Sequence, residues 1–308
     1  MTVDVVIPSY RPGEKFLKLL TMLEEQETLV NKIIIINTEK KYWRSELYEK
    51  FPHLEVHHIA KEQFDHGAAR NMGIGFSKAD IVVCMTDDAV PADKGLITAL
   101  VSGFSRKGPD GETVIEVYGR QLAAEDCSEA EKYTRRFNYP ETSCVKTIRD
   151  LKKLGIKTFF ASNVCCAYRR DLFSKLGGFT GRTIFNEDMI FAAGALKAGY
   201  AVGYAADAKV IHSHNYRPAQ QLHRNFDLGV SQADHPEVFK GVPSEGEGIR
   251  LVKQTACYLV KTRKYRYIPG LIINSGFKYI GYQLGKHYRS LPKGMVRQLS
   301  MNKNYWNR

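Results

Sequence analysis

The chain has 308 residues, of which 44% are hydrophobic and 25% are charged. A chain of this length and hydrophobic content can bury a large core, which excludes a disordered protein and favours one large α/β domain or two smaller ones. No stretch reaches the roughly 18 uninterrupted apolar residues of a membrane span. The N-terminus has neither the positive start nor the long apolar run of a secretory signal, so we expect a cytoplasmic protein.

The positive charge is concentrated at the C-terminal end. The formal net charge is +12, from 45 Lys and Arg against 33 Asp and Glu. Residues 249–308 contain 13 basic and no acidic residues, which leaves 32 basic and 33 acidic residues in 1–248. This asymmetry suggests an anionic partner for the tail, such as a membrane surface, nucleic acid or a phosphorylated substrate. The alternative is a tail whose charge only aids solubility.

The cysteines indicate a reducing compartment. None of the six belongs to a Cys-x-x-Cys pair, which argues against a thiolate metal site. We expect reduced and mostly buried thiols at all six positions, Cys84, Cys127, Cys144, Cys165, Cys166 and Cys257.

In chain order, the first half alternates apolar strands with helical patterns. We predict strands over residues 3–8, 32–37, 54–59 and 80–85, and helices over 13–26 and 67–77. Continuous apolar strands separated by helices are typical of an α/β fold, a parallel sheet covered on both faces. Ligands bind beyond the carboxyl ends of such strands, so Pro8–Tyr10, Asn37–Thr38 and Thr86–Asp88 should meet at one edge.

The second half is less regular. We predict strands over residues 113–122, 158–168 and 208–212, and helices over 129–137, 171–176 and 187–198. Residues 123–157 are polar and should form a loop around their one short helix. A linker over residues 244–248 precedes two apolar and basic helical patterns, over 249–262 and 270–287.

Acidic and histidine residues follow two of the predicted strands. Asp87 and Asp88 come directly after a buried strand, where two carboxylates are costly to desolvate without a cation. Mg²⁺ or Mn²⁺ bridging a diphosphate would supply this cation. An equal alternative is that the two acids belong to an exposed turn that caps the next helix. His212 and His214 end the last strand and share one face, so either could be a metal ligand or a surface histidine.

Four further charged residues have two interpretations each. Glu187 and Asp188 begin a helix, where acidic residues favour the positive end of the helix dipole. Alternatively, one of these carboxylates faces a cleft as a general base. Arg70 and Arg224 could pair with phosphate oxygens or form surface ion pairs.

Taken together and in this order, the motifs resemble the inverting family 2 glycosyltransferases of the GT-A fold, over about residues 1–230. The matching segments are Val5–Tyr10, Phe64–Asn71, Met85–Pro91, Leu176–Phe179, Asn186–Met189 and His212–Tyr216. The second and last of these look most like bacterial rhamnosyltransferases that use dTDP-β-L-rhamnose. The resemblance implies a Rossmann-like, mostly parallel central sheet flanked by helices. The catalytic domain would span residues 1–243, and a basic, aromatic-rich helical extension would span 244–308.

The resemblance also implies a role for each matching residue. The nucleotide sugar would contact Pro8, Tyr10, Asn37, His66, Arg70, Asn71, Asp87 and Arg224. A divalent Mn²⁺ or Mg²⁺ ion would be bound by Asp88 with His212 or His214, between which the sequence does not choose. Asp188 would be the general base, with Glu187 beside it. The sequence departs from the family at Thr86, which replaces the first acid of the DxD motif, and at Asn37-Thr38, where many relatives have an Asp that reads the base.

The implied reaction is a metal-dependent, inverting sugar transfer in bacterial cell-surface polysaccharide synthesis. The first choice of donor is dTDP-β-L-rhamnose, and the acceptor would be a hydroxyl of a glycan or a polyprenyl-diphosphate-linked glycan. One alternative is a UDP-hexose or UDP-N-acetylhexosamine transferase of the same fold. Another is a nucleotide-sugar binding protein without activity, which the acids Asp88 and Asp188 and the histidine His214 argue against.

The basic tail leaves two further questions open. A nucleic-acid binding protein is the alternative from another class, but the sequence has no RNP-like, zinc-finger or helix-turn-helix pattern, so we expect no nucleic-acid partner. Tyrosines and isoleucines lie between the charges of the tail, a pattern typical of an interfacial helix. The tail therefore either binds the inner face of the cell membrane or packs on the catalytic domain.

Overall fold

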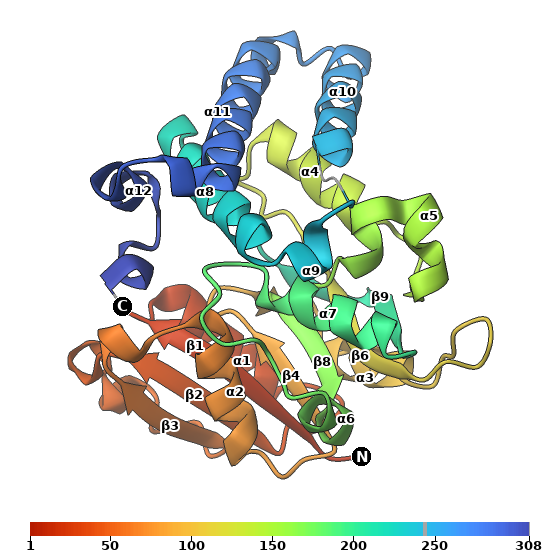
Figure 1. The fold of residues 1–308 in the computed structure, drawn as a ribbon. Coiled ribbons are helices and arrows are strands. Elements are labelled where there is room, and N and C mark those ends of the chain that lie inside the picture. Colours follow the sequence, from red (N-terminus) through yellow and green to blue (C-terminus); the bar gives the residue numbers. More distant parts are fainter. Residues whose placement is uncertain (243–244, 308) are drawn as a thin grey trace. The chain divides into compact units, whose positions relative to one another are not determined.

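The computed structural model describes residues 1–242 and 245–307 (Figure 1). Contacts within the chain divide it into two compact units, each built from separate segments. The first comprises Met1–Leu122, Tyr139–Gly181 and Glu187–His212, and the second comprises Ala123–Asn138, Arg182–Asn186 and the chain from Ser213 onward. The boundary that the sequence predicts, between residues 243 and 244, lies outside the described residues.

A nine-stranded sheet forms the centre of the first unit (Figure 1). Its order is β3-β2-β1-β4-β8-β6-β9-β5, with β7 paired to β9. The strands are β1 (Val3–Tyr10), β2 (Lys32–Thr38), β3 (Leu54–Ile59), β4 (Ile81–Met85), β5 (Val90–Pro91), β6 (Val114–Leu122), β7 (Cys144–Lys146), β8 (Cys165–Arg169) and β9 (Ala201–Ile211). β1 to β4 run parallel, as do β6 and β9, whereas β5, β7 and β8 are antiparallel to their neighbours. The predicted α/β fold with a mostly parallel sheet is confirmed.

Helices cover the two faces of this sheet. α1 (Glu14–Glu24) and α3 (Leu96–Gly103) share a core with alternate residues of β1 and β2. α2 (His66–Phe76) packs on the opposite face, where its Gly73 meets Val6. Burial of one large apolar side chain contributes about 1.5–3 kcal/mol, so the fully buried run from Ile33 to Ile36 strongly favours this arrangement. The first unit also contains α5 (Leu151–Leu154), α6 (Arg170–Lys175) and α7 (Glu187–Lys197).

The second unit consists of helices. They are α4 (Glu129–Asn138), α8 (Pro218–Asp234), α9 (Pro236–Phe239), α10 (Glu245–Lys261), α11 (Ile268–Lys286) and α12 (Lys293–Leu299). α8 and α11 cross so closely that a side chain at Gly281 or Gly285 would clash with the backbone oxygens of Leu222 and Phe226. None of the helices in the described ranges has the length and hydropathy needed to span a membrane.

Three sequence predictions need correction. Of the predicted strand 158–168, only residues 165–168 belong to a strand, β8. Residues 155–159 form a 3-10 helix, and the backbone N–H of Asn163 bonds to a side chain instead of a neighbouring strand. β9 begins at Ala201, well before residue 208, since its alanines and glycine carry no β-branched signal. Residues 245–248 open α10 and are not linker, with two glutamates at the positive end of the helix dipole.

Seven further α-helices and strands within the described ranges were not predicted, namely α3, α5, α8, α9, α12, β5 and β7. α8 begins with Pro218 at its first turn, and β7 pairs with β9 from within the polar region 123–157. The six cysteines are all free thiols, of which Cys144 and Cys257 are exposed and the other four are buried, as expected.

Candidate active site

The ends of β1, β2 and β4 meet at one edge of the sheet, as predicted. Ser9 is paired in register with Asn37, and its hydroxyl donates to Asp87 Oδ2 at 3.1 Å. The backbone N–H of Tyr10 donates to the same oxygen at 3.2 Å. Burial raises the pKa of Asp87, and the charge of Asp88 adds to this effect, while the two hydrogen bonds oppose it. The acidic pair therefore lies directly beyond the end of the first strand.

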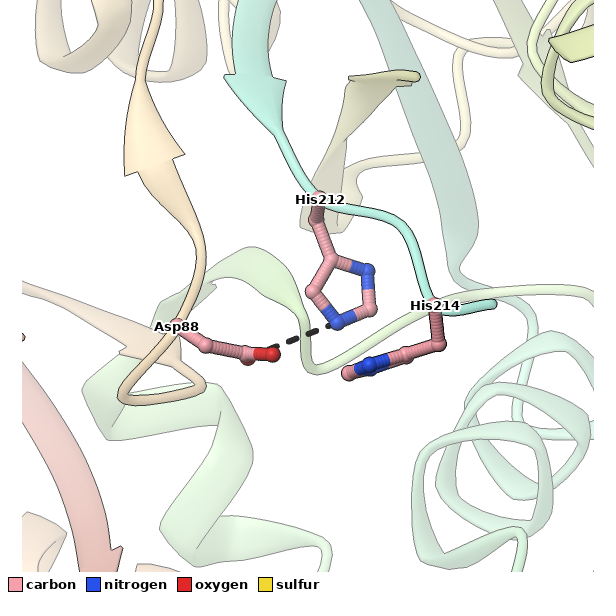
Figure 2. A group of neighbouring side chains, drawn as sticks. All are labelled: Asp88, His212 and His214. Atoms are coloured by element: carbon pink, nitrogen blue, oxygen red, sulfur yellow. Dashed lines mark ion pairs between the residues drawn. The ribbon is translucent and has the colours of Figure 1, made fainter. Parts of the chain in front are cut away.

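Asp88 and His212 form the next part of this edge (Figure 2). His212 Nε2 lies 3.4 Å from Asp88 Oδ1, and the imidazole is 8% exposed. The other ring nitrogen, Nδ1, lies 3.1 Å from Gln121 Oε1, while Gln121 Nε2 donates to the Ser162 hydroxyl at 3.0 Å. With the oxygen of Gln121 toward the ring, this network fits an imidazole proton on Nδ1.

Nε2 of the same ring faces the Asp88 carboxylate, and both groups are acceptors when neither carries a proton. Two such acceptors repel each other unless a proton or a metal cation lies between them. His214 follows two residues later, and one ligand atom from each of Asp88, His212 and His214 lies within 4.8 Å of the others (Figure 2). One carboxylate oxygen and two imidazole nitrogens suit a divalent first-row metal, and a histidine ligand commonly has its second ring nitrogen in contact with an oxygen, as Nδ1 of His212 is with Gln121.

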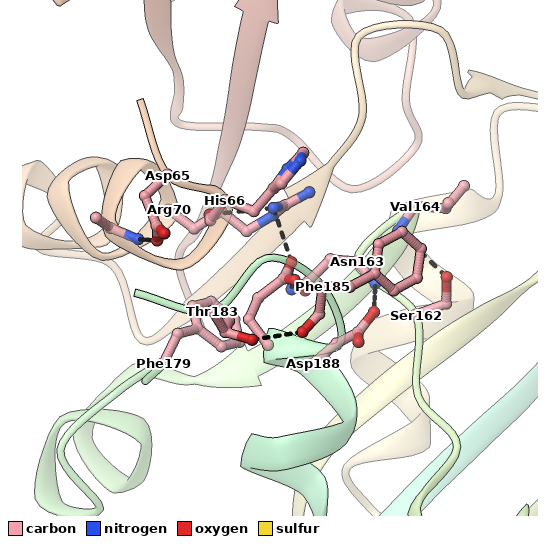
Figure 3. Close-up of polar contacts among 12 residues, drawn as sticks. Asp65, His66, Arg70, Ser162, Asn163, Val164, Phe179, Thr183, Phe185 and Asp188 are labelled. Atoms are coloured by element: carbon pink, nitrogen blue, oxygen red, sulfur yellow. Dashed lines mark hydrogen bonds and ion pairs between the residues drawn. The ribbon is translucent and has the colours of Figure 1, made fainter. Parts of the chain in front are cut away.

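Glu187 and Asp188 begin α7 and have different partners (Figure 3). Arg70 Nη1 donates to Glu187 Oε1 at 2.9 Å, in an ion pair whose side chains are 4% and 9% exposed. Asn163 Nδ2 donates to the same oxygen at 3.1 Å. The backbone N–H groups of Asn163 and Met189 donate to Asp188 Oδ2 and Oδ1, at 3.0 and 2.8 Å. Asn163 therefore contacts both acids.

These partners give the two acids opposite pKa shifts. Burial alone would raise the pKa of Glu187, but the positive charge of Arg70, with His66 and Asn163, holds it below its ordinary value. Burial, together with the nearby charge of Glu187, raises the pKa of Asp188 to about 7, against two backbone hydrogen bonds. Paired acids whose environments separate their pKa values are typical of acid–base sites. Asp188, which is half-buried, can take up a proton near neutral pH.

One short segment, Asn163 and Val164, connects the turn that contains Asp88 of the metal cluster with Asp188, the candidate base. The backbone N–H of Thr86, at the start of the acidic turn, donates to the Val164 carbonyl at 3.3 Å. The preceding residue is Asn163, which holds Asp188 (Figure 3). Asp87, Asp88 and Asp188 therefore lie along the same edge of the first unit.

The start of α2 positions Arg70. Asp65 caps the helix by accepting a hydrogen bond from the Ala68 N–H at 2.9 Å. Gly67 is required here because a Cβ would lie 2.6 Å from the carbonyl oxygen of Thr180. Asn71 exchanges two hydrogen bonds with the backbone of Phe179, at 2.8 and 3.0 Å. In this structure the Arg70 side chain bonds to Glu187 and that of Asn71 to Phe179, and their predicted place in the nucleotide pocket stays a prediction.

The remaining predicted residues lie in three places. Pro8 is half-buried and Tyr10 is 39% exposed at the end of β1. Asn37 is buried and donates to His58 Nδ1 at 3.0 Å. A depression of about 410 Å³ lies beside His58, lined also by Glu39, Lys40, Lys41, Ile59 and Ala60. Arg224 belongs to α8 of the second unit, where its guanidinium lies 4.5 Å from the centre of the Phe185 ring.

Comparison with known protein families matches residues 4–177 to the family described as glycosyl transferase family 2. The chain belongs to this family of glycosyltransferases. It is 38% identical to the O-antigen chain rhamnosyltransferase RfbN of Salmonella typhimurium, over 100% of this chain and 96% of that protein. It is 36% identical to the O-antigen chain rhamnosyltransferase WbaN of Salmonella anatum, over 98% and 95%. The predicted family and enzyme class are confirmed.

A solved structure supports the fold of this glycosyltransferase. The mannosyltransferase PcManGT from Pyrobaculum calidifontis, in complex with GDP-Man and Mn²⁺, has a TM-score of 0.61 to the chain at 15% identity. The similarity covers 94% of this chain and 88% of that one. The predicted GT-A fold is confirmed.

Sequence reasoning missed two residues of the site. Gln121 orients His212 from the end of β6, and Asn163 contacts both acids of α7 from the loop before β8. Their only signal in the sequence is a polar residue at the border of an apolar strand. That signal is common in loops and does not identify a partner far along the chain.

The raised pKa of Asp188 predicts a pH-dependent stability effect. The folded state binds this proton more tightly than the unfolded state, so the stabilisation from Asp188 is present at low pH and is lost as the pH rises through about 7. Between about pH 5 and about pH 8, the melting temperature of Asp188→Asn should therefore rise relative to that of the wild-type protein. Thermal unfolding in chelator measures this difference. The exposed Asp207→Asn is the matched control and should give a constant difference, and a constant difference for Asp188→Asn would contradict the pKa assignment.

Proposed function

We propose that this glycosyltransferase transfers L-rhamnose from dTDP-β-L-rhamnose, with inversion, to a hydroxyl of a lipid-linked glycan in cell-surface polysaccharide synthesis. The donor and the pathway are supported by the similarity to two O-antigen rhamnosyltransferases over nearly the whole chain. The observation that carries the chemistry is the pair of adjacent acids at the start of α7, of which Glu187 is held ionised by Arg70 while Asp188 titrates near neutral pH.

A divalent ion is part of this proposal. The residues suit it, because Nε2 of His212 faces the Asp88 carboxylate and the second ring nitrogen contacts Gln121. Asp88 with His212 or His214 would hold Mn²⁺ or Mg²⁺, and the ion when bound supplies positive charge for the diphosphate leaving group. Arg224 is proposed to bind the same diphosphate. Both histidines are candidate ligands in this proposal.

Asp188 performs the proton transfer in the proposed reaction. An acceptor hydroxyl is a weak nucleophile until its proton is removed, and an Asp188 carboxylate takes that proton as the new bond to the sugar C1 forms. The bond from C1 to the phosphate oxygen breaks at the same time, and its electron pair leaves with the nucleotide diphosphate. Attack from the face opposite the leaving group converts a β-L donor into an α-L-rhamnoside. The reaction requires no covalent enzyme intermediate.

The end of β1 and the residues beyond β2 would bind the nucleotide. Tyr10 is exposed, and its ring meets that of Tyr42 edge-on at 5.6 Å between centres, which gives an aromatic surface on which a base can stack. Pro8 borders this surface. Asn37 and His66 are proposed to contact the nucleotide sugar, and Asp87 to contact its ribose or sugar.

The proposed acceptor implies a location. A polyprenyl-diphosphate-linked glycan is confined to the bilayer, so the enzyme would work from the cytoplasm at the inner face of the cell membrane. Isolated glycan acceptors of the same sequence would then be used at a lower rate.

A donor panel tests the sugar and the metal together. Calorimetry should give the tightest binding for dTDP-β-L-rhamnose among UDP-glucose, UDP-galactose, UDP-N-acetylglucosamine and GDP-mannose, because shape and hydrogen bonds to the sugar decide between donors. Chelator should weaken this binding, and added Mn²⁺ should restore it. If dTDP-β-L-rhamnose binds no more tightly than UDP-glucose, the donor assignment is wrong, whereas the family assignment stands.

Asp188→Asn tests the base. The amide keeps the shape of the side chain but cannot accept a proton, so transfer should fall by about 10²–10⁴-fold while the dissociation constant for the donor stays unchanged. Radiolabelled sugar transfer and calorimetry measure the two quantities. Asp207→Asn should leave both unaltered. Transfer at the wild-type rate by Asp188→Asn would contradict the proposed role.

A further inference from the structure

One face of α11 exposes a continuous row of large apolar side chains. Ile272, Ile273 and Ile280 are 64%, 52% and 51% exposed, Tyr279 is 59% exposed, and Phe277 is 36% exposed. Their spacing of three, four, seven and eight residues puts them on the same side of the helix. No charged side chain interrupts this row, which we call the apolar face of α11. An exposed apolar patch of this kind marks a surface for a partner.

The packing of α11 fixes this face outward. The opposite side of the helix contains Gly281, Tyr282 and Gly285, which are buried. Gly281 and Gly285 approach the backbone of α8 so closely that no other residue can take their place without a shift. The Tyr282 hydroxyl donates to Gln232 of α8 at 2.7 Å. Because the glycine side must face α8, the helix cannot rotate to bury its isoleucines in the same unit.

Basic residues lie beside this apolar face. α10 and α11 are joined by residues 262–267, which form the tip of a helical hairpin in the second unit (Figure 1). Lys261, Arg263 and Arg266 are exposed at this tip, next to the exposed apolar residues Val260 and Tyr265. A face of isoleucine and tyrosine bordered by lysine and arginine is the composition of a helix that lies in the membrane interface.

The charge of the segment selects the partner. The exposed residues at the tip of the hairpin, Lys261, Arg263 and Arg266, are all basic, so two identical tips would repel each other, which disfavours a second copy of the chain as the occupant. An anionic bilayer satisfies both parts of the surface, since its headgroups pair with the basic side chains and its acyl region accepts the apolar ones. Neither helix is apolar enough to span a membrane, so the hairpin would lie along the surface.

We propose that the α10–α11 hairpin is a membrane-docking element that seats the apolar face of α11 in the interface of an anionic bilayer. The inference deepens the proposed function, because it supplies the means by which the enzyme reaches a lipid-linked acceptor. Of the two roles that the sequence leaves open for the basic tail, it assigns membrane binding to the hairpin.

Vesicle flotation tests this proposal with the full-length protein. Wild-type protein should bind vesicles that contain about 30 mol% phosphatidylglycerol at least about ten-fold more tightly than pure phosphatidylcholine vesicles, and salt should weaken the binding. The double variant Ile272→Glu/Ile273→Glu should lose most of this binding. The matched control is Leu29→Glu, which changes a side chain that is 68% exposed in the first unit and should bind as the wild-type protein does.

A charge series separates the basic residues from the apolar ones. The variant Lys261→Gln/Arg263→Gln/Arg266→Gln should lose the preference for anionic vesicles, whereas Lys15→Gln/Lys18→Gln/Lys50→Gln, with three exposed lysines of the first unit, should keep it. Equal binding of both triple variants to anionic vesicles would overturn the proposal. So would wild-type binding to a bare oligonucleotide that exceeds its binding to vesicles, or a stable dimer in sedimentation that the Ile272→Glu/Ile273→Glu change abolishes.

Donor binding distinguishes this proposal from the proposed function. Every hairpin variant should bind dTDP-β-L-rhamnose with the dissociation constant of the wild-type protein, which also reports that the variant is folded. Normal donor binding without binding to anionic vesicles would reject the docking element and leave the transferase activity standing. Binding to vesicles without donor binding would reject the proposed donor and leave the docking element standing.

Discussion

The buried ion pair between Arg70 and Glu187 is the interaction on which the active site depends. Both side chains are almost wholly removed from water, and an unpaired charge there would be strongly destabilising. The pair keeps Glu187 ionised, and that fixed negative charge contributes to the raised pKa of the neighbouring Asp188. Burial is the larger cause of the raised pKa of Asp188; the charge of Glu187 adds to it, and the charge of Arg70 opposes it.

The fold supplies this pair from distant parts of the chain. α2 contributes Arg70 and is fixed by the Asp65 cap and by the hydrogen bonds of Asn71 to Phe179. The short loop before the antiparallel strand β8 contributes Asn163 and also pairs with Thr86 through Val164. The same loop therefore fixes the acidic turn and the candidate base relative to each other.

Much of the first unit could be predicted from the sequence, because its strands have strong local signals. The buried runs of β1, β2 and β4 lie where the apolar pattern places them, and Asp87 and Asp88 follow β4 as expected. The ion pair of Arg70 with Glu187 could not be predicted, since it joins residues 117 positions apart and a lone arginine does not reveal its partner. The role of Asn163 could not be predicted either, because residues 158–168 have the apolar character of a strand.

The second unit was less predictable for a different reason. Its helices are stabilised by contacts with each other, as in the close crossing of α8 and α11 at Gly285, and such contacts have no periodic signal of their own. α8 was not predicted because its polar residues outnumber its apolar ones. The apolar face of α11 was visible in the sequence as a helical pattern, but only the structure reveals that this face points outward.

The most direct measurement of the central claim is the pH dependence of sugar transfer by the wild-type enzyme and by Glu187→Gln. The wild-type rate should rise with pH and level off above about 7, because Asp188 must be ionised to accept a proton. Glu187→Gln keeps the oxygen that Arg70 and Asn163 contact but removes the negative charge, so the midpoint should move to lower pH. A midpoint that does not move, or a rate independent of pH across this range, would contradict the account.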